Sequence, residues 1–192
     1  PRHTAEGCAP AALAPLLDAF PAMHVLVVGE AMLDIYLDGP TGRLCREAPV
    51  PVVNLTRRTD VPGGAGNTAV NVAALGGRLA FLSVIGDDAE AETLTGALQR
   101  AAVPVHDLIV QPGRRTLAKH RVLADGQMVV RYDQGDTGAV DEETEAVVVE
   151  RLKELWPTTD AVIVSDYCYG VVTTGVLDAL AGLQSASPRV LL

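Results

Sequence analysis

Residues 24–29 read HVLVVG, a short and nearly continuous apolar run that is rich in valine. A strand that is buried on both faces has this pattern, whereas a strand with one wet face alternates. Further strands are predicted at 50–56, 79–85, 105–110, 116–123, 128–133, 160–165 and from 190. Helices are predicted at 11–20, 67–75, 89–102, 142–155 and 174–183. Strands that alternate with helices favour a parallel sheet covered on both faces.

One part of the chain departs from this alternation. The strands predicted at 105–110, 116–123 and 128–133 follow one another without a helix, and Asp125-Gly126 is typical of a turn between two of them. We interpret this region as a β element appended to the sheet. Because the chain stops at Leu192 within an apolar run, we expect it to be part of a longer domain.

Composition narrows the class of protein. The 192 residues are 48% hydrophobic, which suits one globular domain or most of a larger one. The formal net charge of -9 argues against binding nucleic acid or an anionic membrane through the overall field, so an anionic ligand needs a local basic cluster. The three cysteines show no metal-ligand spacing, and no apolar run is long enough to span a membrane. We expect a cytoplasmic protein with free thiols.

A glycine-rich turn, Gly63-Gly64-Ala65-Gly66-Asn67, stands between a predicted strand and a predicted helix. Glycines let backbone amides approach a ligand closely, and a helix N-terminus favours an anion or a polar oxygen. No Gly-Lys-Ser/Thr follows, so this is not a P-loop, and the absence of GxGxxG argues against a dinucleotide enzyme. By spacing alone, a tight turn with close helix packing explains the glycines equally well.

The wider context resembles the PfkB family of sugar kinases. The similarity rests on Gly63 to Ala69 followed by Gly76 and Gly86, on the opening strand that ends VGEAMLD at 28–34, and on SVIGDD at 83–88. Within that family the chain is most similar to the D-glycero-β-D-manno-heptose 7-phosphate kinases. The stretches that carry this closer resemblance are GPTGR at 39–43, EAPVPVV at 47–53, TLAKHRV at 116–122, and Gln127 with Arg131 and Asp133.

The resemblance implies a ribokinase-like fold: a doubly wound, mostly parallel α/β sheet with helices on both faces and a small β lid. Residues 1–192 would be the N-terminal portion of one such domain, with the C-terminal part missing and lid strands roughly within 35–60 and 105–134. It also implies a homodimer formed through the lid and ATP-dependent phosphorylation of the anomeric hydroxyl of a heptose 7-phosphate, with Mg²⁺. Another PfkB sugar kinase, or a non-catalytic sugar-phosphate binding protein, remains the alternative.

The candidate site residues include hydrogen-bond partners for sugar hydroxyls and cations that could bind a phosphate. Asp34, expected at the carboxyl end of the opening strand, suits a polyol because a carboxylate accepts hydrogen bonds from vicinal hydroxyls. Lys119 and Arg121 are two apart in a strand and so share a face, where they can neutralise a phosphate. Arg114 and Arg115 are expected on a solvated face of the lid. The substrate-binding residues that we expect are Asp34, Arg43, Gly63, Gly64, Asn67, Lys119, Arg121, Arg131 and Asp166.

Some of these residues have a simpler interpretation: Asp34 as a helix or turn cap, and Asn67 and Asp166 as helix caps. Asp166 lies in Ser165 to Gly170, which resembles the family stretch Ser-Asp-Tyr-x-Lys-Gly, but Tyr169 stands where the family usually has Lys. The family's catalytic base is an Asp in a Gly-Ala-Gly-Asp motif. That motif does not occur in residues 1–192, so we expect the base and the nucleotide-binding segment to lie outside this chain.

Overall fold

The computed structural model describes residue 15 and residues 17–192. Half of the helix predicted at 11–20 lies outside the described residues; residues 15 and 17–19 are helical, and a short 3-10 helix, η1 (Phe20–Ala22), follows. From that point the chain enters the first strand.

The main sheet consists of parallel strands in the order β11-β10-β1-β6-β7. Their bounds are β11 (Val190–Leu191), β10 (Ala161–Ser165), β1 (His24–Gly29), β6 (Arg78–Ile85) and β7 (Leu108–Val110). The first strand is central, since Val27 pairs with Ile163 of β10 on one side and with Phe81 of β6 on the other. The apolar runs at 24–29, 79–85 and 160–165 are thus confirmed as strands of one parallel sheet.

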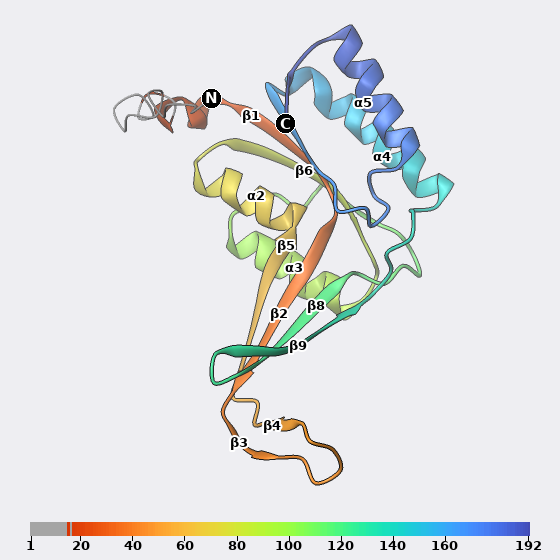
Figure 1. Ribbon diagram of the computed structural model, residues 1–192. Helices are drawn as coiled ribbons and strands as arrows, with labels where there is room; N and C mark the ends of the chain where they lie inside the picture. Colours follow the sequence, from red (N-terminus) through yellow and green to blue (C-terminus); the bar gives the residue numbers. More distant parts are fainter. Residues whose placement is uncertain (1–14, 16) are drawn as a thin grey trace, which may run out of the picture.

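Helices cover both faces of this sheet (Figure 1). They are α2 (Ala65–Ala74) and α3 (Ala89–Arg100) on one face, and α4 (Glu142–Leu155) and α5 (Thr174–Ala186) on the other. Side chains alternate along β1, so Val27 is buried against α2 and α3 while Val28 is buried against α4 and α5. The predicted doubly wound α/β arrangement is confirmed.

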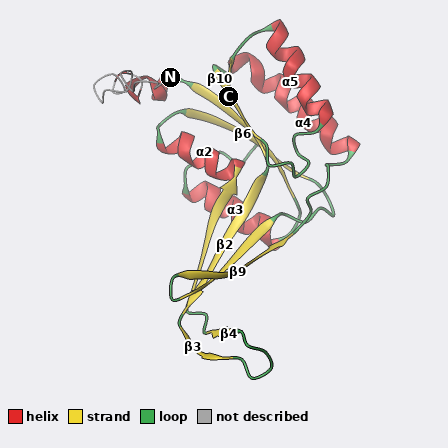
Figure 2. Cartoon of the chain, in the orientation of Figure 1, coloured by secondary structure: helices red, strands yellow, loops and turns green. Residues whose placement is uncertain are grey.

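A second, mixed sheet extends away from the main sheet (Figure 2). Its order is β5-β2-β8-β9, with bounds β5 (Arg57–Gly64), β2 (Ala31–Gly39), β8 (Ala118–Ala124) and β9 (Gln127–Gln134). β2 is parallel to β8, and the other two pairs are antiparallel. One face of this second sheet carries Leu33, Ile35 and Ala118 into the same core as α2 and α3. Beyond its far end lies a hairpin of β3 (Thr41–Leu44) and β4 (Pro51–Val53) (Figure 1).

Three expectations about strands are corrected. The segment predicted at 105–110 was assigned to the appended β element, but β7 pairs in parallel with β6 and so belongs to the main sheet. The strand predicted at 50–56 shortens to β4. Strands β2 and β5 were not predicted individually, only as lid strands roughly within 35–60; β5 is rich in charge and contains Pro62, which an edge strand tolerates.

Candidate functional site

One face of the second sheet is polar because side chains alternate along its strands. Register pairs Asp34 with Lys119, and Lys119 with Asp133, so these three side chains form a row across β2, β8 and β9. Tyr36, Arg121 and Arg131 form the neighbouring row. We call these six residues the polar face; the residues that alternate with them, such as Leu33 and Ile35, are buried in the core.

Asp34 is held in place from two sides. Arg121 donates a hydrogen bond from Nη1 to Asp34 Oδ1 at 2.7 Å, with both side chains about one-fifth exposed, at 18% and 20%. Gly63 leaves room for the carboxylate, since a Cβ added there would lie 2.7 Å from Asp34 Oδ2. The expected location of Asp34 is corrected: β1 ends at Gly29, and Asp34 lies on β2 of the second sheet. Its carboxylate therefore neither ends a main-sheet strand nor caps a helix.

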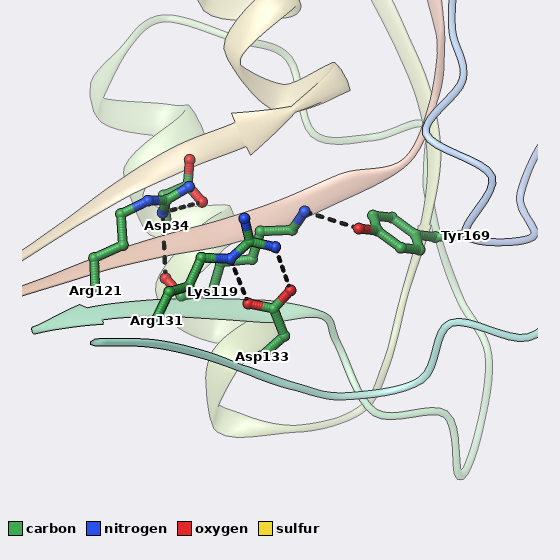
Figure 3. A network of polar contacts seen from close by, with 6 residues as sticks. All are labelled: Asp34, Lys119, Arg121, Arg131, Asp133 and Tyr169. Carbon is green, nitrogen blue, oxygen red and sulfur yellow. Dashed lines mark hydrogen bonds and ion pairs between the residues drawn. The ribbon is translucent and has the colours of Figure 1, made fainter. Parts of the chain in front are cut away.

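Lys119 is the cation of the polar face without an acidic partner. Lys119 is 7% exposed, and its Nζ donates a hydrogen bond to the phenol Oη of Tyr169 at 3.0 Å (Figure 3). Among residues 15 and 17–192, no carboxylate forms an ion pair with this ammonium group. A buried charge without a counter-ion is costly, so the site favours an anion at this point.

The other cations of the polar face are already paired. Arg121 contacts Asp34, and its Cζ lies 5.2 Å from the ring centroid of Tyr36. Arg131 Nη2 lies 2.6 Å from Asp133 Oδ2. The hydrogen bonds from Arg131 hold the pKa of Asp133 below its ordinary value of 3.8, and the charges of Lys119 and Arg121 act in the same direction. The same pairing raises the pKa of Arg131.

The loop after β10 closes the main-sheet end of the site. Its Tyr169 contacts Lys119, as described, while Glu30 accepts hydrogen bonds from two backbone amides of the loop and Arg114 donates one to the carbonyl oxygen of Tyr169. Neither of these two was predicted as a site residue. Arg114 was expected to be solvated, yet it is 9% exposed, and this burial lowers its pKa against the opposing charges of Asp136, Glu30 and Asp141. For Glu30, the available signal was a carboxylate that directly follows a nearly continuous apolar strand.

The glycine turn brings α2 to the same place. Gly64 precedes α2 at a φ of 56°, a left-handed conformation that favours glycine, and a Cβ added there would lie 2.5 Å from the carbonyl oxygen of Glu30. The amide of Ala65 donates to that carbonyl at 2.9 Å. Asn67 is exposed in the first turn of α2, where Gly64 is the N-cap residue, so the capping interpretation of Asn67 is wrong.

Two other expected site residues occupy different surroundings. Asp166 is exposed, and its Oδ1 accepts a hydrogen bond from the amide of Cys168 at 2.7 Å. It does not cap α5, because Thr173 does. Arg43 is exposed on β3, in the hairpin that Figure 1 shows beyond the far end of the second sheet, whereas Asp34 and Lys119 lie on β2 and β8 of that sheet.

A hollow opens on the same side of the second sheet as the polar face. Its volume is about 310 Å³, and its lining residues are Tyr36, Asp38, Arg57, Thr59 and Leu123. That volume is at the lower end of the range for small-molecule sites. In the part of the chain that the structure describes, no group of three or more His, Cys, Asp or Glu side chains is arranged to hold a metal ion. Nor does any described helix have the length and hydropathy to cross a membrane.

Comparison with known proteins gives a consistent family assignment. The profile "pfkB family carbohydrate kinase" matches residues 22–168. The chain is 39% identical over 175 residues to "Bifunctional protein HldE" of Shewanella amazonensis, covering 91% of this chain and 36% of that protein. The protein of the same name from Caulobacter sp. is 40% identical over 178 residues, covering 92% and 36%. The chain thus spans about a third of the length of these relatives.

A solved structure supports the fold independently. The Arabidopsis thaliana ribokinase complexed with ribose and ATP superposes with a TM-score of 0.60 at 16% sequence identity, over 88% of this chain and 52% of that one. At this identity the likeness concerns the fold alone, which is ribokinase-like.

Proposed function

Because the chain belongs to the pfkB family of carbohydrate kinases, we propose that its polar face binds a phosphorylated sugar as the acceptor for phosphoryl transfer from ATP. We further propose that this sugar is a heptose 7-phosphate and that the anomeric hydroxyl is the group phosphorylated. This chain would supply the sugar-binding half of the enzyme.

The observation that carries the proposal is the pairing of Asp34 with Lys119 across β2 and β8. Asp34 offers acceptors to vicinal hydroxyls, and its orientation is set before any sugar arrives, by Arg121 and by the space at Gly63. Lys119 offers a buried positive charge with no carboxylate partner among the described residues. A ligand with hydroxyls and an anionic group satisfies both.

Local charge supports an anionic ligand in an acidic protein. The polar face has three cations, Lys119, Arg121 and Arg131, and two carboxylates, Asp34 and Asp133, which leaves one positive charge. The whole chain has a formal net charge of -9. Because exposed charges are screened within about 10 Å at moderate salt, the local excess decides what binds there.

Support for a heptose comes from where the resembling stretches lie. TLAKHRV contains Lys119 and Arg121 of β8, and Arg131 and Asp133 lie on β9. GPTGR and EAPVPVV lie at the end of β2 and in the β3–β4 hairpin. The features that resemble heptose 7-phosphate kinases therefore lie on the second sheet and in the hairpin beyond it, and those on β8 and β9 belong to the polar face.

ATP is proposed as the phosphoryl donor from family membership, and no residue of this chain is assigned to it. Mg²⁺ would accompany the nucleotide, but the described residues contain no acidic cluster that fits a metal site, so no step is derived through it. The family's Gly-Ala-Gly-Asp motif does not occur in the 192 residues. The role proposed for this chain is to bind the sugar, orient it and neutralise its charge.

A homodimer through the second sheet is proposed as well. β9 is an edge strand with every residue exposed, among them Val130 and Tyr132 on one face, and a register shift places Met128 opposite Leu123. An exposed apolar edge strand readily pairs with another chain. Size measured by light scattering, with Val130→Lys as the disrupting variant, tests this.

A thermal-shift titration of the 192-residue chain tests the sugar assignment. Heptose 7-phosphate should raise the melting temperature, since a ligand at 100 times its Kd stabilises by about 2.7 kcal/mol. Asp34→Asn, which keeps the shape of the side chain, should remove most of the shift. No shift with heptose 7-phosphate, together with a shift from a plain pentose or hexose, would rule out the heptose assignment.

A non-catalytic sugar-phosphate binding protein is the second candidate, favoured by Tyr169 where the family usually has Lys. Such a protein would use the same polar face, so a binding measurement alone does not distinguish it from a kinase. ADP release in the presence of ATP, Mg²⁺ and heptose 7-phosphate does: sugar-dependent ADP favours the kinase, and binding without turnover favours the binding protein.

A further inference from the structure

Tyr169, in the loop after β10, contacts a residue of the second sheet that lies far from it in the sequence. It is half-buried in the loop after β10, and its phenol lies against the ammonium group of Lys119 on the second sheet (Figure 3). Oη accepts a hydrogen bond from Nζ at 3.0 Å, and Nζ lies 4.7 Å from the ring centroid. This contact joins the two sheets at the point where the carboxyl ends of β1 and β10 meet the polar face.

Two buried charges fix the backbone on either side of Tyr169. Glu30, 3% exposed, accepts hydrogen bonds from the amides of Tyr167 at 2.7 Å and Val171 at 3.1 Å. Arg114, 9% exposed, donates to the carbonyl oxygen of Tyr169 itself at 3.0 Å. A loop without neighbouring strands gains its backbone partners from these side chains, so the main chain at Tyr169 is held in place, and the contact with Lys119 orients the phenol.

The hydrogen-bond capacity of the pair is not exhausted. An ammonium group has three donors, and Lys119 uses one of them for Tyr169. A phenol that accepts one hydrogen bond still has its own O–H to donate. The Lys119 ammonium group and the Tyr169 hydroxyl therefore both have hydrogen atoms to donate at the same place. Among the described residues no carboxylate forms an ion pair with this ammonium group.

We propose that Tyr169 is a ligand-binding residue, which donates its phenol hydrogen to an anionic phosphate oxygen beside Lys119. Glu30 and Arg114 are positioning residues that act through the loop backbone. The identity of the phosphate rests on the proposed function: it belongs either to the sugar phosphate or to the nucleotide. Both sources present the same kind of phosphate oxygen. The ligand whose affinity falls in the Tyr169 variant shows which of the two phosphates Tyr169 contacts.

The test is Tyr169→Phe in the 192-residue chain, measured by calorimetric titration with heptose 7-phosphate, unphosphorylated heptose, ATP and inorganic phosphate. Removing one hydrogen bond to a charged oxygen should weaken heptose 7-phosphate or ATP about tenfold or more, and heptose less than twofold. Tyr167→Phe is the matched control, because it removes a more exposed hydroxyl from the same loop. It should change none of the four affinities. Unchanged binding of both phosphorylated ligands by Tyr169→Phe, or an equal loss for plain heptose, overturns the proposal.

A second arm separates direct donation from an effect through Lys119. In a Lys119→Met background, Tyr169→Phe should still weaken the phosphorylated ligand threefold or more. No further loss there means that Tyr169 acts only by holding Lys119, which contradicts its role as a ligand-binding residue.

Different results would refute the proposed function and the role proposed for Tyr169. If the unsubstituted chain binds neither sugar, the sugar-kinase proposal is wrong, and inorganic phosphate then decides about Tyr169. Weaker phosphate binding by Tyr169→Phe supports the inference, whereas equal or absent phosphate binding overturns it.

Discussion

Gly63→Ala should disable the sugar site while leaving the fold nearly intact. A Cβ at position 63 would lie 2.7 Å from Asp34 Oδ2 and 2.8 Å from Cγ, far inside the usual contact distance of about 3.5–4.0 Å between carbon atoms. The backbone of Gly63 does not require glycine, because it is absent from the residues with positive φ. The clash is therefore with one side chain, and Asp34 must rotate away from Arg121.

Gly63→Ala should lower the free energy of unfolding only slightly, because one contribution of the substitution offsets part of the other two. Breaking the bond between Asp34 and Arg121, 2.7 Å long and about one-fifth exposed, costs about 1 kcal/mol after allowing for solvent screening. An off-rotamer carboxylate adds about 0.5–1.5 kcal/mol, and alanine returns about 0.4–1 kcal/mol by restricting the unfolded chain. The net loss should be about 1 kcal/mol in urea denaturation.

Affinity should fall much further than stability. An Asp34 carboxylate that has turned away loses at least one hydrogen bond to a sugar hydroxyl, about 1.5–3 kcal/mol for a charged acceptor, so Kd should rise at least tenfold. Calorimetric titration with heptose 7-phosphate measures this. Gly182→Ala is the control: its Cβ would meet nothing within 4 Å, so binding should not change. Wild-type affinity in a folded Gly63→Ala variant would refute the role given to Asp34.

The remaining predictions concern charges. Lys119→Met should leave stability unchanged or up to about 1 kcal/mol higher, because it removes a buried and unpaired charge, but it should weaken sugar phosphate at least tenfold in thermal-shift titrations; wild-type affinity contradicts this. Glu30→Gln turns an amide group toward backbone N–H donors and should cost about 2 kcal/mol or more in urea denaturation, and a loss under about 0.5 kcal/mol would show that the loop does not depend on Glu30. Hydrogen bonds from Thr144 lower the pKa of Asp141 below 3.8, so its ionised form stabilises the folded state above that pH and the stabilisation is lost as pH falls through the folded pKa. The Tm difference between wild type and Asp141→Asn should be constant from about pH 5 to 7 and shrink below about pH 4, and an undiminished difference at pH 3 would contradict it.

The main sheet was predictable because its signals are local. Strands β1, β6 and β10 are apolar runs, and α4 begins and ends as predicted because Asp141 caps a periodic segment. The second sheet was harder to predict. β2 does alternate, with Leu33 and Ile35 inward and Asp34 and Tyr36 outward, but it is not a continuous apolar run like the strands of the main sheet. β7 has only three residues, and its place beside β6 depends on the crossover through α3.

The site was predictable only in part. That Lys119 and Arg121 share a face follows from their spacing, and the register agrees. The partners of Glu30 lie 137 and 141 residues further along, so its position after an apolar strand does not by itself indicate which loop this buried carboxylate is bonded to. Arg43 was expected from its resemblance to family members, and its distance from the other residues depends on where the β3–β4 hairpin lies (Figure 1).

A crystal structure of the 192-residue chain with heptose 7-phosphate measures the central claim most directly. The polar face predicts a sugar hydroxyl within about 3.2 Å of an Asp34 carboxylate oxygen and the phosphate within salt-bridge distance of Lys119. A sugar bound elsewhere, with Asp34 still bonded to Arg121, Lys119 still bonded to Tyr169 and no ligand beside either, would contradict it.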